Sequence, residues 1–145
     1  MTKIYFAGSI RGGRSDAHIY KELVVVLSKY GKVLTEHVGD TSPESGEIGK
    51  TEQYIFERDV KWIAEADVLV AEVTVPSLGV GYEISTAEHL GKRILCLYRP
   101  QGGKLLSSMI LGNRKLQVKS YENISAATAT IEKFLQNELS PNASK

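Results

Sequence analysis

The clearest structural signal in the chain lies in residues 4–35, which read IYFAGSIRGGRSDAHIYKELVVVLSKYGKVLT. The short apolar run Ile4 to Ala7 is typical of a buried strand. After a glycine-rich turn, Ala17 to Tyr30 carries apolar residues at helical spacing and stops at Gly31. A second apolar run, Val33 to Thr35, completes a strand, helix and strand. Such a unit favours a right-handed crossover between parallel strands.

The same alternation continues along the chain. Further buried strands are predicted over Val68 to Val73, Ile94 to Tyr98 and Leu116 to Val118. Further helices are predicted over Thr51 to Ala66, Tyr82 to Leu90, Lys104 to Leu111 and Ile124 to Leu139. This order predicts an α/β fold with a doubly wound parallel sheet of five strands and helices on both faces. The loops that follow the strands are then expected to carry the function.

Length, charge and cysteine content limit the classes of protein to consider. With 145 residues we expect one domain over residues 1–140 and a flexible tail at 141–145. The formal net charge of +1 gives no field toward nucleic acid or an anionic membrane, so neither is expected as a partner. Cys96 is the single cysteine and lies in a predicted strand, and no signal peptide or membrane-spanning stretch is visible. We therefore expect a cytoplasmic protein, also nuclear if the source is eukaryotic.

Residues 8–15, Gly-Ser-Ile-Arg-Gly-Gly-Arg-Ser, connect the first strand to the first helix. Glycines let backbone N–H groups approach an anion, the helix N-terminus adds positive potential, and Arg11 or Arg14 can add a charged contact. The spacing fits neither the Walker A nor the dinucleotide G-x-G-x-x-G pattern, so one phosphate group is preferred to a triphosphate or a dinucleotide. The alternative is an ordinary glycine-bearing turn with solvated arginines.

Glu83 ends a second loop of the same design, Pro76 to Glu83, which follows the strand Val68 to Val73. We place it in the first turn of the next helix, where the helix dipole favours the ionised carboxylate, a competent nucleophile. At helical spacing it shares a face with Ala87 and Leu90, so it leans toward the packed side. A favourable helix-end charge without a catalytic role remains the alternative.

Asp59 occupies an apolar helix face. The stripe that it shares consists of Ile55, Trp62, Ile63 and Ala66. A buried acid has to be paired, neutralised or positioned for chemistry, and the plain alternative is a pair with Arg58, Arg93 or a backbone donor. Two carboxylates near a phosphate loop suggest glycosidic cleavage, with one as nucleophile and the other as acid for the leaving group.

Other polar residues give weaker signals. The histidines His18, His37 and His89 are scattered, so no metal ion is predicted. His37 either lines the pocket or is a hydrogen-bonded structural residue, and Tyr5, just before the phosphate loop, can orient a carboxylate. Residues 39–50 are rich in Gly, Ser, Pro and acidic side chains, and form either a mobile loop beside the ligand site or a solvated connector.

Six segments combine into a specific pattern. They are YFAGSIRGGR at 5–14, LTEHV at 34–38, ADV at 66–68, AEVT at 71–74, PSLGVGYE at 76–83 and KRILCLYRP at 92–100. The pattern resembles the 2'-deoxynucleoside 5'-phosphate N-hydrolase (Rcl) family of the nucleoside 2-deoxyribosyltransferase superfamily, from Lys3 to about Gly112. The resemblance implies a Rossmann-like fold, no cofactor, and hydrolysis of 2'-deoxynucleoside 5'-monophosphates to free base and 2-deoxyribose 5-phosphate.

The resemblance also implies roles for individual residues. Glu83 would attack C1' and form a covalent deoxyribosyl ester, Asp59 would assist departure of the base, and Tyr5 would hold or tune Glu83. Around the substrate phosphate the family pattern places Ser9, Ile10, Arg11, Gly12, Ser77 and Gly79.

A homodimer is implied as well, in which Ser107 and Met109 would enter the site of the neighbouring subunit. A two-fold interface can place the same loop in both sites. The chain departs from the family pattern at one position: where members often read Met-Ile-Arg-Gly, it has Leu111 before Gly112. The partner-side phosphate contact therefore lacks its basic side chain.

Three other functions are alternatives to nucleotide hydrolysis. A nucleoside 2-deoxyribosyltransferase shares the covalent chemistry but passes deoxyribose to another base, and the arginine-bearing loop favours a monophosphate instead. A phosphoribohydrolase of the cytokinin-activating type would carry a Pro-Gly-Gly-x-Gly-Thr run, which is absent. A catalytically silent nucleotide-binding module would keep the fold and the phosphate site, and the presence of both Glu83 and Asp59 argues against it. The preferred base, including a modified pyrimidine such as a 5-hydroxymethyl base, is left open.

Overall fold

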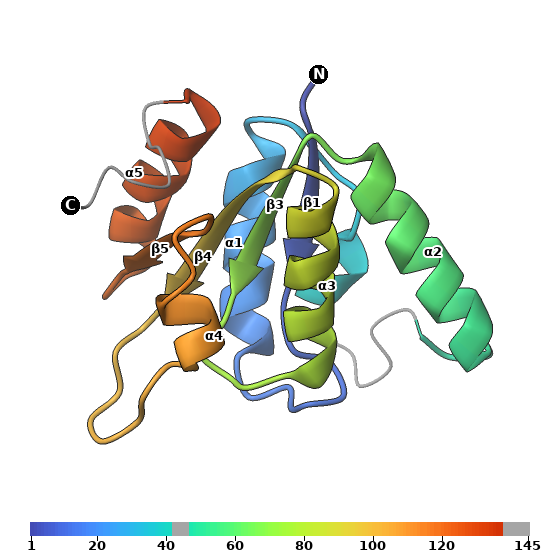
Figure 1. The fold of residues 1–145 in the computed structure, drawn as a ribbon, viewed down its shortest axis with the longest axis horizontal. Coiled ribbons are helices and arrows are strands. Elements are labelled where there is room, and N and C mark those ends of the chain that lie inside the picture. The colour runs from blue at the N-terminus through green and yellow to red at the C-terminus, as the bar shows by residue number, and fades with distance from the viewer. Residues whose placement is uncertain (42–46, 138–145) are drawn as a thin grey trace.

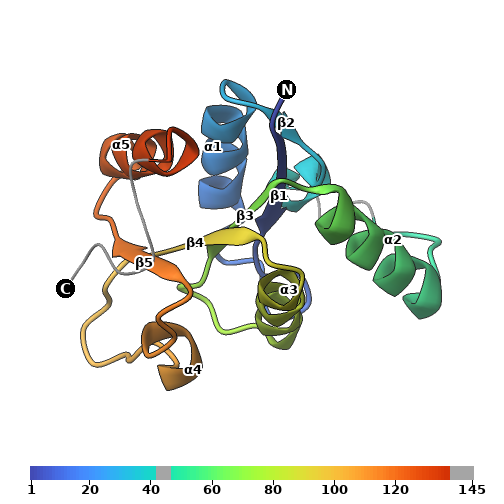
Figure 2. The ribbon, with the colours of Figure 1, turned by 45° about the horizontal axis from the view of Figure 1, so that its top comes forward.

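The computed structural model describes residues 1–41 and 47–137. Its elements are β1 (Lys3–Ala7), α1 (Ala17–Ser28), β2 (Lys32–Val33), the 3-10 helix η1 (Glu36–Gly39), α2 (Glu52–Glu65), β3 (Val68–Glu72), α3 (Leu78–His89), β4 (Arg93–Tyr98), α4 (Ser108–Leu111), β5 (Gln117–Ser120) and α5 (Ile124–Leu135). Figures 1 and 2 show the strands as a central sheet with helices on either side.

The sheet is all parallel and has the order β2-β1-β3-β4-β5. The chain begins in the interior at β1, moves outward to β2, crosses back to β3 and then continues outward to β4 and β5. The direction of winding thus reverses between β1 and β3. This reversal is a topological switch point, where the two following loops diverge and leave room for a ligand. The predicted doubly wound five-stranded sheet is confirmed.

Two apolar clusters bind the helices to the sheet. On one face Val70 of β3 packs with Leu23 of α1 and Ile131 of α5. On the other face Leu69 of β3 packs with residues of α2 and α3, including Ile63 and Ala87. Successive strand residues point to opposite faces, so a central parallel strand has to be apolar on both. β3 is accordingly buried along its whole length.

The second strand is shorter than predicted, because Thr35 continues its pairing with a side chain instead of the backbone. The Thr35 hydroxyl donates to the Phe6 carbonyl oxygen at 2.7 Å and accepts from the Phe6 N–H at 2.9 Å. Its backbone has by then turned into η1. The side chain therefore satisfies the edge of β1 that the departing strand leaves open.

Two predicted helices have different beginnings. The helix predicted over Lys104 to Leu111 is wrong for most of its length: only the single turn Ser108–Leu111 forms, after the Ser107 hydroxyl accepts from the Met109 N–H at 3.2 Å. Conversely, α3 begins at Leu78 instead of Tyr82, because the Ser77 hydroxyl accepts from the Val80 N–H at 3.3 Å. Glu83 is consequently in the second turn of α3, and its placement in the first turn was wrong.

Some predictions fall wholly or partly beyond the described residues. These are the tail at 141–145, the end of the last predicted helix at 138–139 and positions 42–46 of the loop at 39–50. Within the described ranges, no helix has both the length and the apolar character needed to cross a membrane.

Candidate active site

The loops that follow β1 and β3 touch each other at the switch point. A Cβ on Gly12 would lie 2.9 Å from Ser9 Oγ and 3.0 Å from the Pro76 carbonyl oxygen, so only glycine fits there. Ser9 is fully buried, and its hydroxyl has no hydrogen-bond partner among the described residues. A buried polar group of this kind is a candidate ligand contact. The two predicted phosphate-binding loops therefore form one continuous surface.

The two arginines of the first loop have different surroundings. Arg14 donates to the carbonyl oxygens of Ser9 at 3.0 Å, Val38 at 3.1 Å and Asp40. It therefore connects the first loop to the segment that contains η1. Arg11 has a side chain that is 65% exposed and pairs with Glu52 at the start of α2. Exposed pairs are weak and exchange readily with solvent or a ligand. Of the two, Arg11 is the one that can turn toward a bound anion.

Glu83 is joined to Tyr5 across the gap between α3 and β1. The Tyr5 hydroxyl donates to the Glu83 carboxylate, and Tyr5 itself is buried. The other carboxylate oxygen of Glu83 would be 3.8 Å from a Cβ on Gly79. The side chain therefore runs back toward the N-terminus of its helix, as helical side chains do. In this way a residue of the second turn places its carboxylate over the loop that carries Ser77 and Gly79.

Burial decides the protonation of Glu83. Desolvation raises the pKa of Glu83 to about 8; the hydrogen bond from Tyr5 lowers this pKa, and the negative charge of Asp59 raises it. The expectation that the helix dipole keeps Glu83 ionised is therefore wrong, because the residue lies beyond the first turn and in a desolvated position. Burial also raises the pKa of Tyr5 far above its ordinary value, so Tyr5 remains a hydrogen-bond donor.

Asp59 belongs to the same electrostatic cluster. It accepts a hydrogen bond from Arg58 Nε at 2.9 Å, which is one of the partners that the sequence suggested. Arg93, another suggested partner, instead donates to the Phe134 carbonyl oxygen at 2.6 Å. Burial raises the pKa of Asp59 and the pairing with Arg58 opposes this, while the Asp59 charge in turn raises the pKa values of Tyr5 and Glu83. Asp59 is thus electrostatically coupled to both Tyr5 and Glu83.

Arg58, the partner of Asp59, also contacts Glu47 and His37, and sequence did not single out these three residues together. Arg58 Nη2 donates to Glu47 Oε1 at 3.0 Å, and its guanidinium lies 4.8 Å from the ring centroid of Trp62. His37 Nε2 lies 3.4 Å from both Arg58 Nη2 and Glu47 Oε1. Burial, together with the charge of Arg58, lowers the pKa of His37 to about 4, so it is neutral at pH 7. Arg58 was suggested by sequence as a partner of Asp59, whereas no sequence signal connected Glu47 with it.

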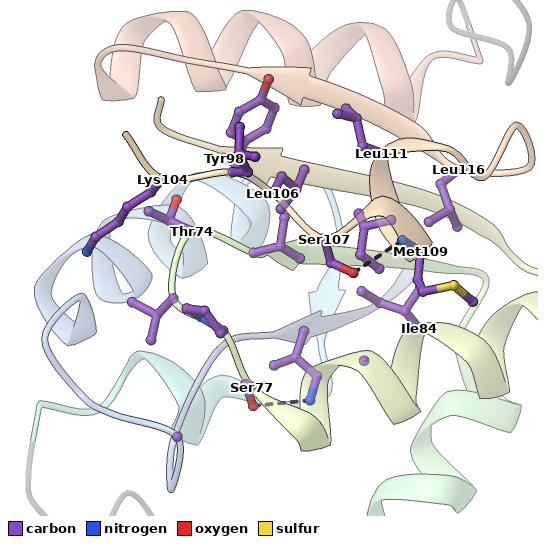
Figure 3. A pocket seen from close by; sticks show the side chains of 18 of the residues that line it. Thr74, Ser77, Ile84, Tyr98, Lys104, Leu106, Ser107, Met109, Leu111 and Leu116 are labelled. Carbon is purple, nitrogen blue, oxygen red and sulfur yellow. Dashed lines mark hydrogen bonds between the residues drawn. The ribbon is translucent and has the colours of Figure 1, made fainter. Parts of the chain in front are cut away.

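Four of the predicted site residues, Gly12, Ser77, Ser107 and Met109, line a cavity of about 970 Å³. Figure 3 shows it between α3 and the segment that carries α4, with Ser77 on one side and Ser107 and Met109 on the other. Its described lining includes Gly12 but neither Glu83 nor the two residues grouped with it. Within one chain, therefore, Ser107 and Met109 do not meet the carboxylate cluster. Ile10 is partly buried against the core on the α1 side.

Among the described residues, no group of three or more histidine, cysteine, aspartate or glutamate side chains is arranged to hold a metal ion.

Comparison with known families places this arrangement in context. Residues 4–133 match the family model described as nucleoside 2-deoxyribosyltransferase. The chain belongs to the nucleoside 2-deoxyribosyltransferase family. Members of this family provide the most informative relatives, and the resemblance noted in the sequence motifs is confirmed.

Two relatives within the nucleoside 2-deoxyribosyltransferase family are more than half identical to this chain. A protein of Nematostella vectensis, named "Putative 2'-deoxynucleoside 5'-phosphate N-hydrolase 1", is 54% identical over 125 residues, which are 83% of this chain and 85% of the relative. The 5-hydroxymethyl-dUMP N-hydrolase of Mus musculus is 58% identical over 111 residues, 75% of this chain and 64% of the relative. Both names describe cleavage of an N-glycosidic bond, in agreement with the enzyme class predicted from the motifs.

Solved structures of more distant proteins share the fold of the nucleoside 2-deoxyribosyltransferase family. The CMP N-glycosidase of Clostridium botulinum aligns with a TM-score of 0.65 at 18% identity, over 90% of this chain and 99% of that one. A 2-deoxyribosyltransferase of Bacillus psychrosaccharolyticus aligns with a TM-score of 0.62 at 20% identity, over 88% and 90% of the two chains. At this identity the likeness supports the architecture alone.

Proposed function

We propose that the protein hydrolyses the N-glycosidic bond of 2'-deoxynucleoside 5'-monophosphates, releasing the free base and 2-deoxyribose 5-phosphate. The observation that carries this proposal is the hydrogen bond from Tyr5 to Glu83 beside Asp59, at the junction of the two loops. Enzymes that cleave glycosidic bonds usually use a pair of carboxyl groups. The names of the 50–58% identical relatives support the same bond and substrate class.

In the first step a Glu83 carboxylate oxygen attacks C1' of the deoxyribose. The C1'–N bond breaks, its electron pair stays with the base, and the base takes a proton from Asp59. Glu83 has then formed a covalent deoxyribosyl ester. Tyr5 steers the reacting carboxylate by its hydrogen bond and partly offsets the desolvation that keeps Glu83 protonated.

In the second step water resolves the ester. Asp59, now a carboxylate, takes a proton from the water while the water oxygen attacks C1'. The bond between C1' and the Glu83 oxygen breaks, and its electron pair returns to the carboxylate. The product is 2-deoxyribose 5-phosphate, and the two carboxyl groups regain their initial charges.

The substrate phosphate is proposed to bind between the two loops. Backbone N–H groups near Ile10 and Gly12, the free hydroxyl of Ser9 and the start of α3 at Ser77 and Gly79 supply donors there. Arg11 adds charge once it leaves its exposed pair with Glu52. The fully buried Ser9 hydroxyl, which lacks a protein partner among the described residues, supports this placement.

We further propose a cytoplasmic homodimer in which Ser107 and Met109 complete the neighbouring site. Met109 is 81% exposed and Leu105, which lines the same cavity, is 97% exposed, although both carry large apolar side chains. Exposed apolar groups that cluster in this way mark a contact surface. Because Ser107 lines a cavity whose described lining lacks Glu83, a role for Ser107 in catalysis would be exerted at the partner's site.

The test is release of free base, followed by chromatography. Purified protein is incubated with a panel of deoxynucleoside monophosphates that includes 5-hydroxymethyl-dUMP, with the matching nucleosides and ribonucleotides, and with a second free base as acceptor. The proposal expects release from deoxynucleoside monophosphates only, and loss of at least about a hundredfold in rate in the Glu83→Ala variant. No release, with monophosphate binding intact, sinks the hydrolase proposal. Exchange onto the added base instead of hydrolysis identifies a transferase.

A further inference from the structure

A second buried polar cluster lies on the opposite face of the sheet from Glu83 and has no part in the chemistry proposed above. Its centre is Glu72, the last residue of β3, which is fully buried on the side of α1 and α5. Glu72 accepts from the Thr74 N–H at 2.7 Å, from the Thr74 hydroxyl at 3.0 Å and from the Tyr121 hydroxyl. A buried carboxylate with this many donors holds its neighbours in one geometry.

Arg99 connects this cluster to the phosphate loop. It follows β4, pairs through Nη2 with the Asp16 carboxylate, and lies with Nε 3.7 Å from Glu72 Oε2. The backbone N–H of Arg99 donates to the Thr74 hydroxyl at 2.9 Å. The side chains of Arg99 and Asp16 are only 21% and 11% exposed. Four chain segments, which follow β1, β3, β4 and β5, therefore meet in one network of hydrogen bonds and ion pairs.

Asp16 contributes to this network instead of to its helix. It occupies the N-cap position of α1, where an aspartate ordinarily accepts from a backbone N–H of the first turn. Here the side chain makes no such cap bond and pairs with Arg99. Forgoing a local cap for a contact 83 positions away indicates that the position serves to fix the loop before α1.

We propose that Arg99 is a positioning residue for the phosphate site: through Asp16 and Glu72 it sets the distance between the loop at 8–16 and the loop at 73–77. The inference rests on the proposed function, because it is these two loops that would hold the substrate phosphate. They already approach within contact distance at Gly12 and Pro76, so a small displacement changes the alignment of every donor between them.

Arg99 acts by geometry and not as an attracting charge. Its guanidinium lies between two carboxylates, those of Asp16 and Glu72, and the three groups together carry no surplus of positive charge. Nη2 and the backbone N–H of Arg99 donate to Asp16 and Thr74, whereas Nε makes no hydrogen bond within the described residues and lies 3.7 Å from the Glu72 carboxylate.

The test measures binding of 2'-deoxyuridine 5'-monophosphate by calorimetry to four proteins that all carry Glu83→Ala, so that the nucleotide is not consumed: Glu83→Ala alone, and Glu83→Ala with Arg99→Met, with Asp16→Asn or with both. The same changes are made in the protein with Glu83 intact to measure kcat. Each single variant is expected to weaken binding about tenfold, and the double variant no more than a single one, because both changes break the same link. At saturating substrate, kcat is expected to stay within about threefold of the wild type, because the carboxylate cluster lies on the other face.

Arg93 provides the matched control. It lies at the opposite end of β4, donates to the Phe134 carbonyl oxygen and covers the Phe134 ring at 4.3 Å. Arg93→Met removes a half-buried arginine from the same strand, remote from the phosphate loop, and is expected to leave the Kd within about twofold. Equal weakening by Arg93→Met and Arg99→Met overturns the proposal, since general loosening of the fold then explains both.

Four further outcomes are decisive. Multiplication of the single effects in the double variant means that Arg99 and Asp16 act independently, which overturns the proposal. If Arg99→Met does not fold, Asp16→Asn decides alone, because it keeps the shape of the side chain, and an unchanged Kd overturns the proposal.

Wild-type protein that binds the nucleotide but releases no base refutes the hydrolase function only. Full turnover with unchanged Kd in all variants refutes the role of Arg99 only.

Discussion

The charge of Asp59 raises the pKa of Glu83, and this coupling decides how the activity is expected to depend on pH. With the pKa of Glu83 raised to about 8, Glu83 holds the proton at pH 7 and Asp59 is the partner paired with Arg58. The chemistry proposed here needs the reverse arrangement, an ionised Glu83 and a protonated Asp59. Both arrangements hold one proton on the two carboxyl groups, so pH does not change their ratio. The total population of the singly protonated pair depends on pH, and its pKa values describe the pair and not either residue alone.

The activity of the wild type is therefore expected to fall as pH rises through about 8, where the pair loses its last proton. In Asp59→Asn no proton is held for the leaving base, and Glu83 only has to ionise. The residual activity of this variant is expected to rise with pH, with a midpoint below that of the wild type, because the Asp59 charge that raises the pKa of Glu83 is gone. The check is kcat/KM for base release between pH 5 and 10 for both proteins.

A matched control separates this effect from general damage to the site. Glu57 lies on the exposed side of α2, two positions from Asp59, and accepts a hydrogen bond from the Gln53 side chain at 2.9 Å. Glu57→Gln is expected to reproduce the wild-type profile. Profiles that fall in the same direction for the wild type and Asp59→Asn would contradict the role of Asp59 as proton donor.

At the level of single residues, sequence reasoning named the carboxyl groups that are proposed to react, and Arg58 beside Asp59, but not the rest of their surroundings. Asp59 was found because a carboxylate on an apolar helix face is costly, Glu83 because it ends a glycine-bearing loop at the start of a helix, and Tyr5 because it precedes the phosphate loop. Glu72 and Arg99 went unnoticed because their value lies in contacts between segments far apart in sequence, such as the pair of Arg99 with Asp16. No local pattern records such a pair.

At the level of secondary structure, α3 depends on one side chain at its start. The Ser77 hydroxyl caps the helix through the Val80 N–H, and the glycines at 79 and 81 give little helix propensity of their own. This explains why the start at Leu78 was missed: periodicity is silent where the first turn has two residues without side chains. The core positions of the strands, by contrast, were predictable from their unbroken apolar runs.

Ser77→Ala is expected to cost about 1 kcal/mol of stability through loss of the cap. It is also expected to raise KM for a monophosphate substrate, because Ser77 is proposed to contact the phosphate. Ser77→Asp restores a capping oxygen but places a negative charge beside the anion, so Tm is expected to recover while KM stays high. Thermal denaturation and steady-state kinetics on the same samples measure both effects.

Asn123 gives the comparison for this prediction, since its side chain caps α5 through the Ala126 N–H at 2.9 Å, away from both loops. Asn123→Ala is expected to lower Tm by a similar amount with KM unchanged. Recovery of both Tm and KM in Ser77→Asp would show that Ser77 acts on the substrate only through the helix.

At the level of the whole molecule, the winding order places the two halves of the site on different elements. The switch point brings β1 and β3 side by side, and with them Tyr5 and the loop that leads to Glu83. The segment with Ser107 follows β4 and faces the cavity on the other side of α3. Sequence alone could predict the order of the elements, whereas the separation of Ser107 from Glu83 follows only from the three-dimensional arrangement.

This separation makes the proposed dimer testable by complementation. Glu83→Ala and Ser107→Ala chains are mixed in equal amounts under conditions that exchange subunits. If Ser107 serves the partner's site, each mixed dimer has one intact site, formed by Glu83 of one chain and Ser107 of the other. Half of the dimers are mixed and half of their sites are intact, so activity is expected to recover to about a quarter of the wild type. Activity no higher than the mean of the two parent proteins would show that Ser107 acts within its own chain or not at all. Size-exclusion chromatography of the mixture confirms that dimers are present, so an absence of recovery cannot be ascribed to dissociation.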